Sequence, residues 1–457
     1  MARDLAIGFD FGTSNSAIAV AEPGEGAARL LHLDRTSPHA TQIPTVLYLT
    51  RDGTARIGYE AIEAYVAAEA GRRIVRKRQT TGQYIDTDTS GLGPQEVWSE
   101  VDVSQPGRFF QSLKRFLADR GFRGTNVFGR YYTMEDLIAT IMREMRLRAE
   151  EEVGQPITRA TVGRPVHWAE NDPKGDARAL GRMETALRAA GFVEFHFVPE
   201  PIAAGLHFAA TLPAPRNVLV FDFGGGTLDV TVMRIGGDER TVLSTAGILL
   251  GGNTLDEEIM DGRLLKYFGE DLRWGAQQLP MPNHILDSIR RWYTIPDLNE
   301  PRTVAFLENL ERETVGRARR QAQALRSLAR GNHGWSLFRE IERVKIGLSA
   351  REIERIGYGA DAIAIDEPLP RREFEALIET RVRQAGRCID GALAAAALEP
   401  GQIDAVVRTG GSSAIPRFQR LLTDMFGADK LRFQDAFTSV VTGLALSAAG
   451  HLADSAA

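Results

Sequence analysis

The chain has 457 residues, of which 43% are hydrophobic and 25% are charged, and its formal net charge is −5. This composition is typical of a globular protein large enough for two lobes, and the net charge argues against a nucleic-acid or membrane-surface role. Because no apolar run approaches about 18 residues and the first strand starts at once, we expect neither a membrane span nor a signal peptide. The single cysteine, Cys388, excludes an internal disulfide and a cysteine-rich metal site, and we expect it to be inert packing. These features favour a cytoplasmic protein, which we take to be a monomer.

Two copies of one strand–turn–strand pattern stand out. The first copy covers residues 7–16 and ends its opening strand at Asp10, and the second covers residues 220–229 and ends it at Asp222. Glycines let backbone N–H groups approach phosphate oxygens, and hydroxyl side chains add further donors. An aspartate repels phosphate but can hold a hydrated Mg²⁺ ion that neutralises it. The duplication therefore predicts a site in which two loops grip a polyphosphate from opposite sides. The loop residues are Gly12, Thr13, Ser14, Asn15, Gly224, Gly225, Gly226 and Thr227.

The rest of the first half predicts strands and helices around the first copy. A strand entered through Pro44 is followed by a short helix, and residues 71–108 are polar and basic, which favours a solvated insert over a nucleic-acid patch. Residues 109–117 are expected to form a compact helix that carries Lys114. Thr133, with Asp136 three residues later, predicts a capping box at the start of an amphipathic helix.

The first half closes with further alternating elements. A strand over residues 160–166 is broken by Pro165, a helix follows over 176–190, and a strand over 195–198 leads through Pro199 into a helix that begins near Glu200. Two prolines between residues 211 and 216 predict a boundary between halves.

The second half repeats this plan around the second copy. The glycine pair Gly251–Gly252 precedes a helix that carries Asp256, an arrangement that suits an anion. Residues 262–350 are expected to be mostly charged helix, with 304–330 as one long segment. A last strand and glycine turn over 405–413, and an alanine-rich helix over 438–449, complete the chain.

The predicted fold is α/β, with two lobes that each contain a hairpin-led sheet and helices. Each lobe carries an insert. The expected boundaries are lobe I at 1–212, with its core at 1–38 and 132–212 and its insert at 39–131, and lobe II at 213–457, with its core at 213–255 and 351–457 and a helical insert at 256–350.

In this order, the motifs resemble the ATPase domain of the seventy-kilodalton heat-shock chaperones of the DnaK type, within the actin and sugar-kinase superfamily. The resemblance extends over nearly the whole chain and implies a two-lobed actin-like ATPase fold built on duplicated ribonuclease-H-like domains. The segments that carry it are the two phosphate loops, Lys114, Pro165, Glu200-Pro201, Gly251–Gly252, Glu342-x-x-Lys345-x-x-x-Ser349 and Gly410-Gly411-Ser412.

The resemblance implies a role for each matching position. Asp10 and Asp222 match the carboxylates that hold Mg²⁺ through water, and Asp229 matches a position that can bind a monovalent cation such as K⁺. Lys114 matches the lysine that orients the attacking water, and Glu200 matches the acid that holds metal-bound water. Thr13, Ser14, Gly225, Gly226 and Thr227 match phosphate contacts, Glu342, Lys345 and Ser349 the adenosine side, Gly410, Gly411 and Ser412 the base-side turn, and Pro165 a hinge between lobes.

Three departures from the family pattern matter. Two arginines flank the adenine in the chaperones, whereas Ile346 and Ala414 stand at the matching positions, so we expect weaker nucleotide binding. Asp435, followed by Phe437-Thr438, replaces the usual acidic residues near the C-terminus. No acidic-leucine linker follows Leu452, and we expect no peptide-binding domain, as in the short bacterial YegD-like branch.

The resemblance implies a slow, Mg²⁺-dependent ATPase that acts as a conformational switch, a chaperone-like protein in which ATP or ADP is the ligand. Two alternatives stay open: a small-molecule kinase of the same fold, and an actin-like filament or nucleotide-sensing platform whose inserts bind a protein partner.

Overall fold

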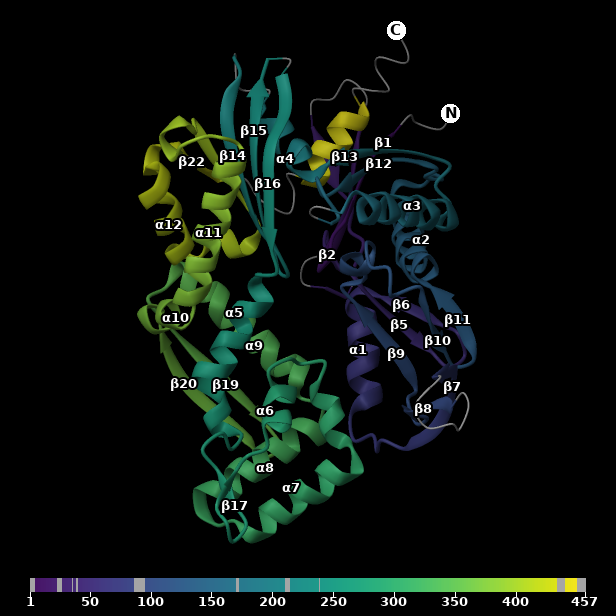
Figure 1. Ribbon diagram of the computed structural model, residues 1–457, viewed down its shortest axis with the longest axis vertical. Coiled ribbons are helices and arrows are strands. Elements are labelled where there is room, and N and C mark those ends of the chain that lie inside the picture. The colour runs from purple at the N-terminus through teal and green to yellow at the C-terminus, as the bar shows by residue number, and fades with distance from the viewer. Residues whose placement is uncertain are drawn as a thin grey trace.

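Each lobe is built on one mixed β-sheet, and the two lobes stand side by side in the computed structural model (Figure 1). The structure describes residues 5–22, 27–34, 36–37, 40–85, 95–169, 172–209, 214–237, 239–433 and 440–449. Asp435, Phe437 and Thr438 lie outside these ranges. None of the helices within them is long and apolar enough to cross a membrane.

The sheet of lobe I follows the order β13-β12-β1-β2-β3, and β4 pairs with β2. The first phosphate-loop pattern forms its central hairpin, in which Asp10 pairs with Ala17, and β12 runs parallel to β1. The strands are β1 (Ala6–Phe11), β2 (Asn15–Ala21), β3 (Ala28–Leu30), β4 (Ile43–Pro44), β12 (Arg159–Arg164) and β13 (Glu194–Pro199).

The sheet of lobe II repeats this connectivity. Its order, β16-β15-β14-β21-β22, has the second hairpin at the centre and β21 parallel to β14, so each strand has a counterpart in lobe I. The strands are β14 (Arg216–Phe223), β15 (Leu228–Gly236), β16 (Glu239–Ile248), β21 (Ala405–Thr409) and β22 (Leu431–Phe433). The predicted duplication and the two-lobed α/β fold are confirmed.

Alternation along β1 explains how both faces of the lobe I sheet are covered. Phe9 and Phe11 belong to a core with α2 (Met134–Val153) and α3 (Pro173–Ala190), whereas Ala6 packs with a closing helix over residues 440–449. Successive strand side chains point to opposite faces, so each face receives its own cover. At the start of α2 the predicted capping box between Thr133 and Asp136 is confirmed.

Lobe II is covered in the same way. Phe221 and Phe223 face the core formed by α5 (Gly252–Ile259), α11 (Glu379–Ala395) and α12 (Pro416–Phe426), in which Cys388 is buried. The opposite face packs against Ile202 of α4 (Glu200–Ala209). Ala203 of α4 also packs against Leu444 of the closing helix, so these two helices cross between the lobes.

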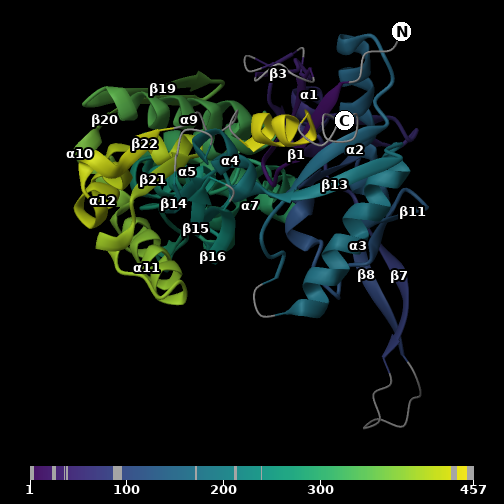
Figure 2. The same ribbon diagram turned by 90° about the horizontal axis from the view of Figure 1, so that it is seen from above.

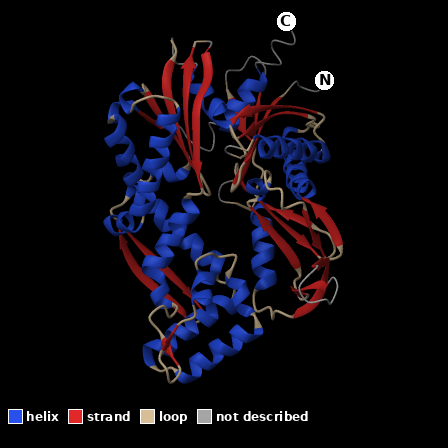
Figure 3. Cartoon of the chain, viewed as in Figure 1, coloured by secondary structure: helices blue, strands red, loops and turns tan. Residues whose placement is uncertain are grey.

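The insert of lobe I is rich in strands (Figure 3). It contains β5 (Val46–Thr50), β6 (Ala55–Ile57), α1 (Gly58–Glu69), β9 (Gly107–Gln111), β10 (Gly124–Val127) and β11 (Arg130–Thr133). The predicted basic stretch contains the hairpin β7 (Arg76–Ile85) and β8 (Gln95–Asp102), which reaches away from the lobe (Figure 2).

The predicted helix over 109–117 is wrong. Phe109 and Phe110 lie in β9, where they pair with Tyr48 and Leu47 and point to opposite faces. Ser112 then adopts a left-handed conformation with φ of 54°, and only a single 3-10 turn, Leu113–Phe116, remains helical. Backbone pairing of β9 with β5, which no local pattern encodes, overrides the helical reading of this short segment.

The insert of lobe II is mostly helical, as predicted (Figure 3). The expected single helix over 304–330 is split in two at Thr314 and Val315, both of which are extended. The helices are α6 (Asn283–Ile289), α7 (Pro301–Glu313), α8 (Gly316–Arg330) and α9 (Gly334–Ala350), with the short strands β17 (Arg273–Trp274) and β18 (Leu279–Pro280).

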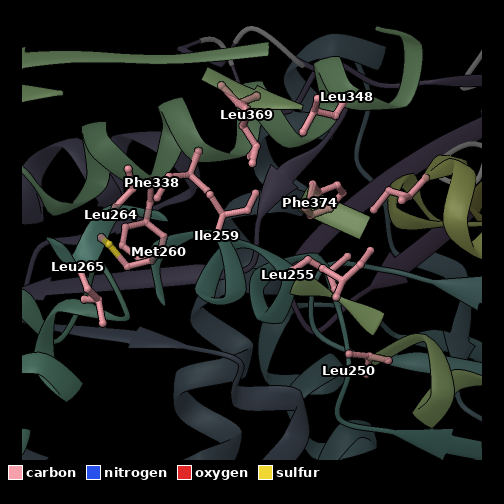
Figure 4. Packing of buried hydrophobic residues seen from close by; sticks show 14 of the residues in the cluster. Leu250, Leu255, Ile259, Met260, Leu264, Leu265, Phe338, Leu348, Leu369 and Phe374 are labelled. Carbon is pink, nitrogen blue, oxygen red and sulfur yellow. The ribbon is translucent and has the colours of Figure 1, made fainter. Parts of the chain in front are cut away.

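Helix α9 joins this insert to the core. Its Phe338 packs near Ile259, the last residue of α5, and near Met260, which follows it (Figure 4). The hairpin β19 (Ile353–Ala360) and β20 (Ile363–Pro370) packs on α9 and α8 rather than on the core sheet, and α10 (Arg371–Leu377) leads back to the core. The exact lobe boundaries stay a prediction.

The two inserts contact each other across the molecule. The side-chain amide of Asn332 donates to the carbonyl oxygen of Val66 at 3.1 Å, and the N–H of Gly71 donates to the carbonyl oxygen of Arg330 at 2.6 Å. The Trp292 ring also lies 6.1 Å from that of Tyr65, measured between centroids. We call this set the insert bridge.

Candidate functional site

A cavity of about 430 Å³ lies between the lobes and is lined by both phosphate loops. Of the residues predicted for catalysis and phosphate contact, the structure brings together Asp10, Gly12, Thr13, Ser14, Asn15, Lys114, Glu200, Asp222, Gly224, Gly225, Gly226, Thr227, Asp229 and Gly410. They come from two lobes and from segments up to 400 residues apart, so the cavity depends on the complete fold.

The two loops face each other closely. A Cβ atom added to Gly225 or Gly226 would come within 3.2 Å of Ser14 Oγ, so any side chain there would narrow the space between the lobes. Loop I is fixed from behind, because Ser16 Oγ accepts from the Gly12 N–H at 3.2 Å and lies 2.7 Å from Thr45 Oγ1. The result is a narrow, donor-rich gap of the kind that suits phosphate oxygens.

Three aspartates line this gap. Burial, followed by the charge of Glu200, raises the pKa of Asp10 to about 7, and burial raises the pKa of Asp222 to about 6 even though Thr409 Oγ1 donates to it at 2.7 Å. Asp229 is accessible from the cavity but lies deep between the lobes, where burial and the charge of Asp222 raise its pKa to about 7. Neighbouring carboxylates repel one another when they are ionised, so these three aspartates need a nearby cation if all of them are to be ionised at once.

Lys114 pairs directly with a carboxylate of this cavity. Its Nζ donates to Glu200 Oε1 at 2.7 Å, and the residue is only 8% exposed. Burial alone would lower the pKa of Lys114, but Glu200 and Asp10 outweigh burial and raise it. The ammonium also lies 5.7 Å from the centre of the Trp168 ring. Lys114 is therefore held charged and in place at the cavity wall.

The acidic residues fit a hydrated metal ion. Among the described residues, no group of three or more His, Cys, Asp or Glu side chains is placed to hold a metal directly. Asp10 and Asp222 end matching strands of the two lobes and face one cavity, an arrangement that can receive an ion through its water molecules, as Mg²⁺ often binds.

Several predicted binding residues lie behind the second loop rather than in the cavity. The Gly252 N–H donates to the Gly224 carbonyl oxygen at 3.0 Å, and Ser412 Oγ donates to the same oxygen at 3.1 Å. Gly251 lies so close that a Cβ atom there would overlap the Gly225 carbonyl. Four of the predicted residues line neither this cavity nor the second cavity described below, namely Gly251, Gly252, Gly411 and Ser412. Their contacts instead support the second phosphate loop from behind.

Lys345 and Ser349 also lie outside the cavities. The Lys345 ammonium is buried, donates to Asp256 at 2.9 Å and to the Gly252 carbonyl oxygen at 3.0 Å, and so ties α9 to α5. Burial raises the pKa of Asp256 to about 7, and Lys345 opposes that rise. Of the three predicted adenosine-side residues, only Glu342 lines a cavity.

That second cavity, of about 580 Å³, adjoins the first and extends between the inserts. At one end it is lined by phosphate-loop residues that also line the first cavity, namely Thr13, Ser14, Asn15 and Gly226. At the other end the inserts supply Tyr59, Trp335 and Arg339. Tyr59, Trp335 and Arg339 are not among the site residues that the sequence predicted. The available signal was the spacing of Trp335, Arg339 and Glu342, which places them on one face of a helix.

The two positions that replace the flanking arginines, Ile346 and Ala414, line neither cavity. Ile346 is 62% exposed, and Ala414 is half-buried. Arg417, three residues after Ala414, does not take the place of the arginine that Ala414 replaces. Its guanidinium is held by both carboxylate oxygens of Glu379, at 3.0 and 3.1 Å.

A model of the protein family described as Hsp70 protein matches residues 6–274 and 330–455. The chain belongs to the Hsp70 family. The phosphate loops, Lys114 and Glu200 all fall within the matched ranges, whereas residues 275–329, which hold α6, α7 and most of α8, do not. The finer YegD-like placement stays a prediction.

Curated Hsp70 relatives include Chaperone protein dnaK3 of Synechococcus elongatus, 27% identical over 459 residues, with 98% of this chain and 51% of the relative covered. Chaperone protein DnaK of Thermus thermophilus is 27% identical over 453 residues, covering 97% and 60%. Heat shock 70 kDa protein BIP3 of Oryza sativa is 27% identical over 434 residues, covering 92% and 52%. The chain spans about half to three-fifths of these relatives.

Proposed function

We propose that this Hsp70 family chain binds ATP and ADP with Mg²⁺ between its lobes and hydrolyses ATP slowly, as a chaperone-like conformational switch. The observation that carries the proposal is the pair of facing phosphate loops with three aspartates and the Lys114–Glu200 pair between them. A protein partner or client at a surface of the inserts is part of the proposal, and the names of the relatives, which are chaperones, support it.

Each group has a distinct task in this proposal. Backbone N–H groups of the loops, with Thr13 and Thr227, hold the phosphate oxygens. Asp10 and Asp222 hold the hydrated Mg²⁺, which supplies charge neutralisation when it is bound. Asp229 is the candidate for a monovalent cation such as K⁺.

Lys114 and Glu200 are proposed to orient the attacking water. The ammonium is fixed by its 2.7 Å hydrogen bond, so one of its remaining N–H groups can donate to a water in line with the terminal phosphate. Glu200 accepts that hydrogen bond, and its second oxygen would accept from a water molecule of the bound ion. Positioning of this kind lowers the barrier mainly by removing orientational freedom from the reactants.

Single-turnover hydrolysis with stoichiometric ATP tests the proposal. We expect phosphate to be released without any added acceptor and the reaction to stop when EDTA removes Mg²⁺. Phosphate transfer only in the presence of an added alcohol or sugar would instead support the kinase alternative, and absence of ATP binding would refute both.

A further inference from the structure

We infer that the base of the bound nucleotide stacks in the second cavity, against Tyr59, Trp335 and Arg339. Arg339 lies about two helical turns along α9 from Ile346, the position at which the chaperones carry an arginine. This inference rests on the proposed function. It assigns the site to a nucleoside 5′-di- or triphosphate and identifies Trp335 and Arg339 as residues that determine affinity for the base.

Continuity of the two cavities is the first argument. The second cavity contains Ser14 and Gly226 at its phosphate-loop end and Trp335 at its insert end. Its volume of about 580 Å³ falls within the usual range for small-molecule sites. A nucleotide whose phosphates lie between the loops can therefore extend its sugar and base into this space.

The chemistry of the wall is the second argument. The Tyr59 and Trp335 rings are 6.1 Å apart, and the Arg339 guanidinium carbon lies 5.5 Å from the first and 5.8 Å from the second. Arg339 Nη1 donates to the Tyr59 hydroxyl at 2.7 Å, which fixes the plane of the guanidinium. Aromatic rings and planar guanidinium groups both stack well on nucleobases.

The positions along α9 are the third argument. Arg339 and Glu342 both line the cavity, so a ribose near Glu342 would bring its base close to Arg339. Ile346, one turn beyond Glu342, is 62% exposed and lines neither cavity. Trp335 and Arg339 on α9 thus offer the stacking groups that Ile346 and Ala414 do not.

Calorimetric titration of Trp335→Ala with Mg·ADP and with Mg·pyrophosphate tests the inference, because pyrophosphate probes the phosphate loops without a base. We expect ADP affinity to fall roughly tenfold or more, as for loss of one base-stacking group, while pyrophosphate affinity is unchanged. Trp335→Phe should recover part of the loss. Trp274→Ala is the matched control, since Trp274 packs against Phe306 and lines neither cavity.

A second variant guards against a folding defect. Arg339→Ala should also weaken ADP binding selectively, and ADP but not pyrophosphate should quench the part of the emission that Trp335→Phe removes. Unchanged ADP affinity in both variants, or an equal loss for ADP and pyrophosphate, would overturn the inference. Failure of the wild-type chain to bind either ligand would overturn the proposed function and this inference with it.

Discussion

Replacing Lys114 tests the proposed chemistry most directly. In Lys114→Ala, the ammonium that donates to Glu200 at 2.7 Å is lost, and with it the group that orients water. Removing one preorganised donor from a catalytic site typically lowers the rate by about 10²–10³-fold, so we expect a loss of at least about 100-fold in single-turnover hydrolysis.

The same substitution has a second, separable effect. Glu200 would be left beside Asp10 without its partner, and because its side chain is still 23% exposed, we expect a destabilisation of about 1–3 kcal/mol, less than for a fully buried pair. Lys114→Ala combined with Glu200→Gln should recover stability without recovering hydrolysis. Thermal unfolding and rapid-quench hydrolysis measure the two effects independently.

Lys266→Ala provides the matched control, because Lys266 also pairs with a glutamate, Glu367, at 2.9 Å but lies outside both cavities. Its hydrolysis rate should equal that of the wild type. Hydrolysis by Lys114→Ala at the wild-type rate, with ATP bound, would refute the role of Lys114 in orienting water.

Three further predictions concern the carboxylates, the second loop and the insert bridge. Because burial raises the pKa values of Asp10 and Asp222 to about 7 and about 6, the folded chain holds more protons than the unfolded chain between about pH 4 and about pH 7. Stability without ligand should therefore fall as pH rises through this window and level off above it. Affinity for Mg·ADP should rise over the upper part of that window, since the ion needs ionised carboxylates; calorimetry between pH 6 and about 8 that finds no change would contradict this. Gly251→Ala should abolish nucleotide binding or destabilise lobe II, because its Cβ would overlap the Gly225 carbonyl, whereas a titration like that of the wild type would contradict the packing argument. Asn332→Gly keeps the backbone conformation, with φ of 49°, but removes the hydrogen bond from Asn332 to Val66 in the insert bridge. Stopped-flow release of labelled ADP should therefore be about fivefold faster. An unchanged release rate would mean that this hydrogen bond does not limit opening of the lobes.

The features that the sequence predicted are those encoded over short stretches. Each phosphate loop lies within ten residues of a strand with strong alternation, so Asp10 and Asp222 could be placed at strand ends without knowledge of the fold. The duplication of these hairpins was enough to predict two matching sheets. The glycine pair before α5 was also recognisable, although not its position behind the loop.

The features that the sequence did not predict depend on contacts between distant segments. Lys114 was placed on a helix because Phe109 and Phe110 fit either period, and only pairing with β5 decides for a strand. The second cavity brings Tyr59 of one insert to Trp335 of the other, 276 positions away in the chain. No local pattern could indicate that these rings meet.

The insert bridge lies at the opposite end of the molecule from the crossing of α4 and the closing helix (Figure 1). If the lobes rotate about that crossing, the inserts move furthest because they lie furthest from it. A contact such as Asn332 to Val66 must therefore break early in opening. Neither residue lines a cavity. The residence time of a ligand can therefore change through residues that never touch it, independently of the contacts that set its affinity.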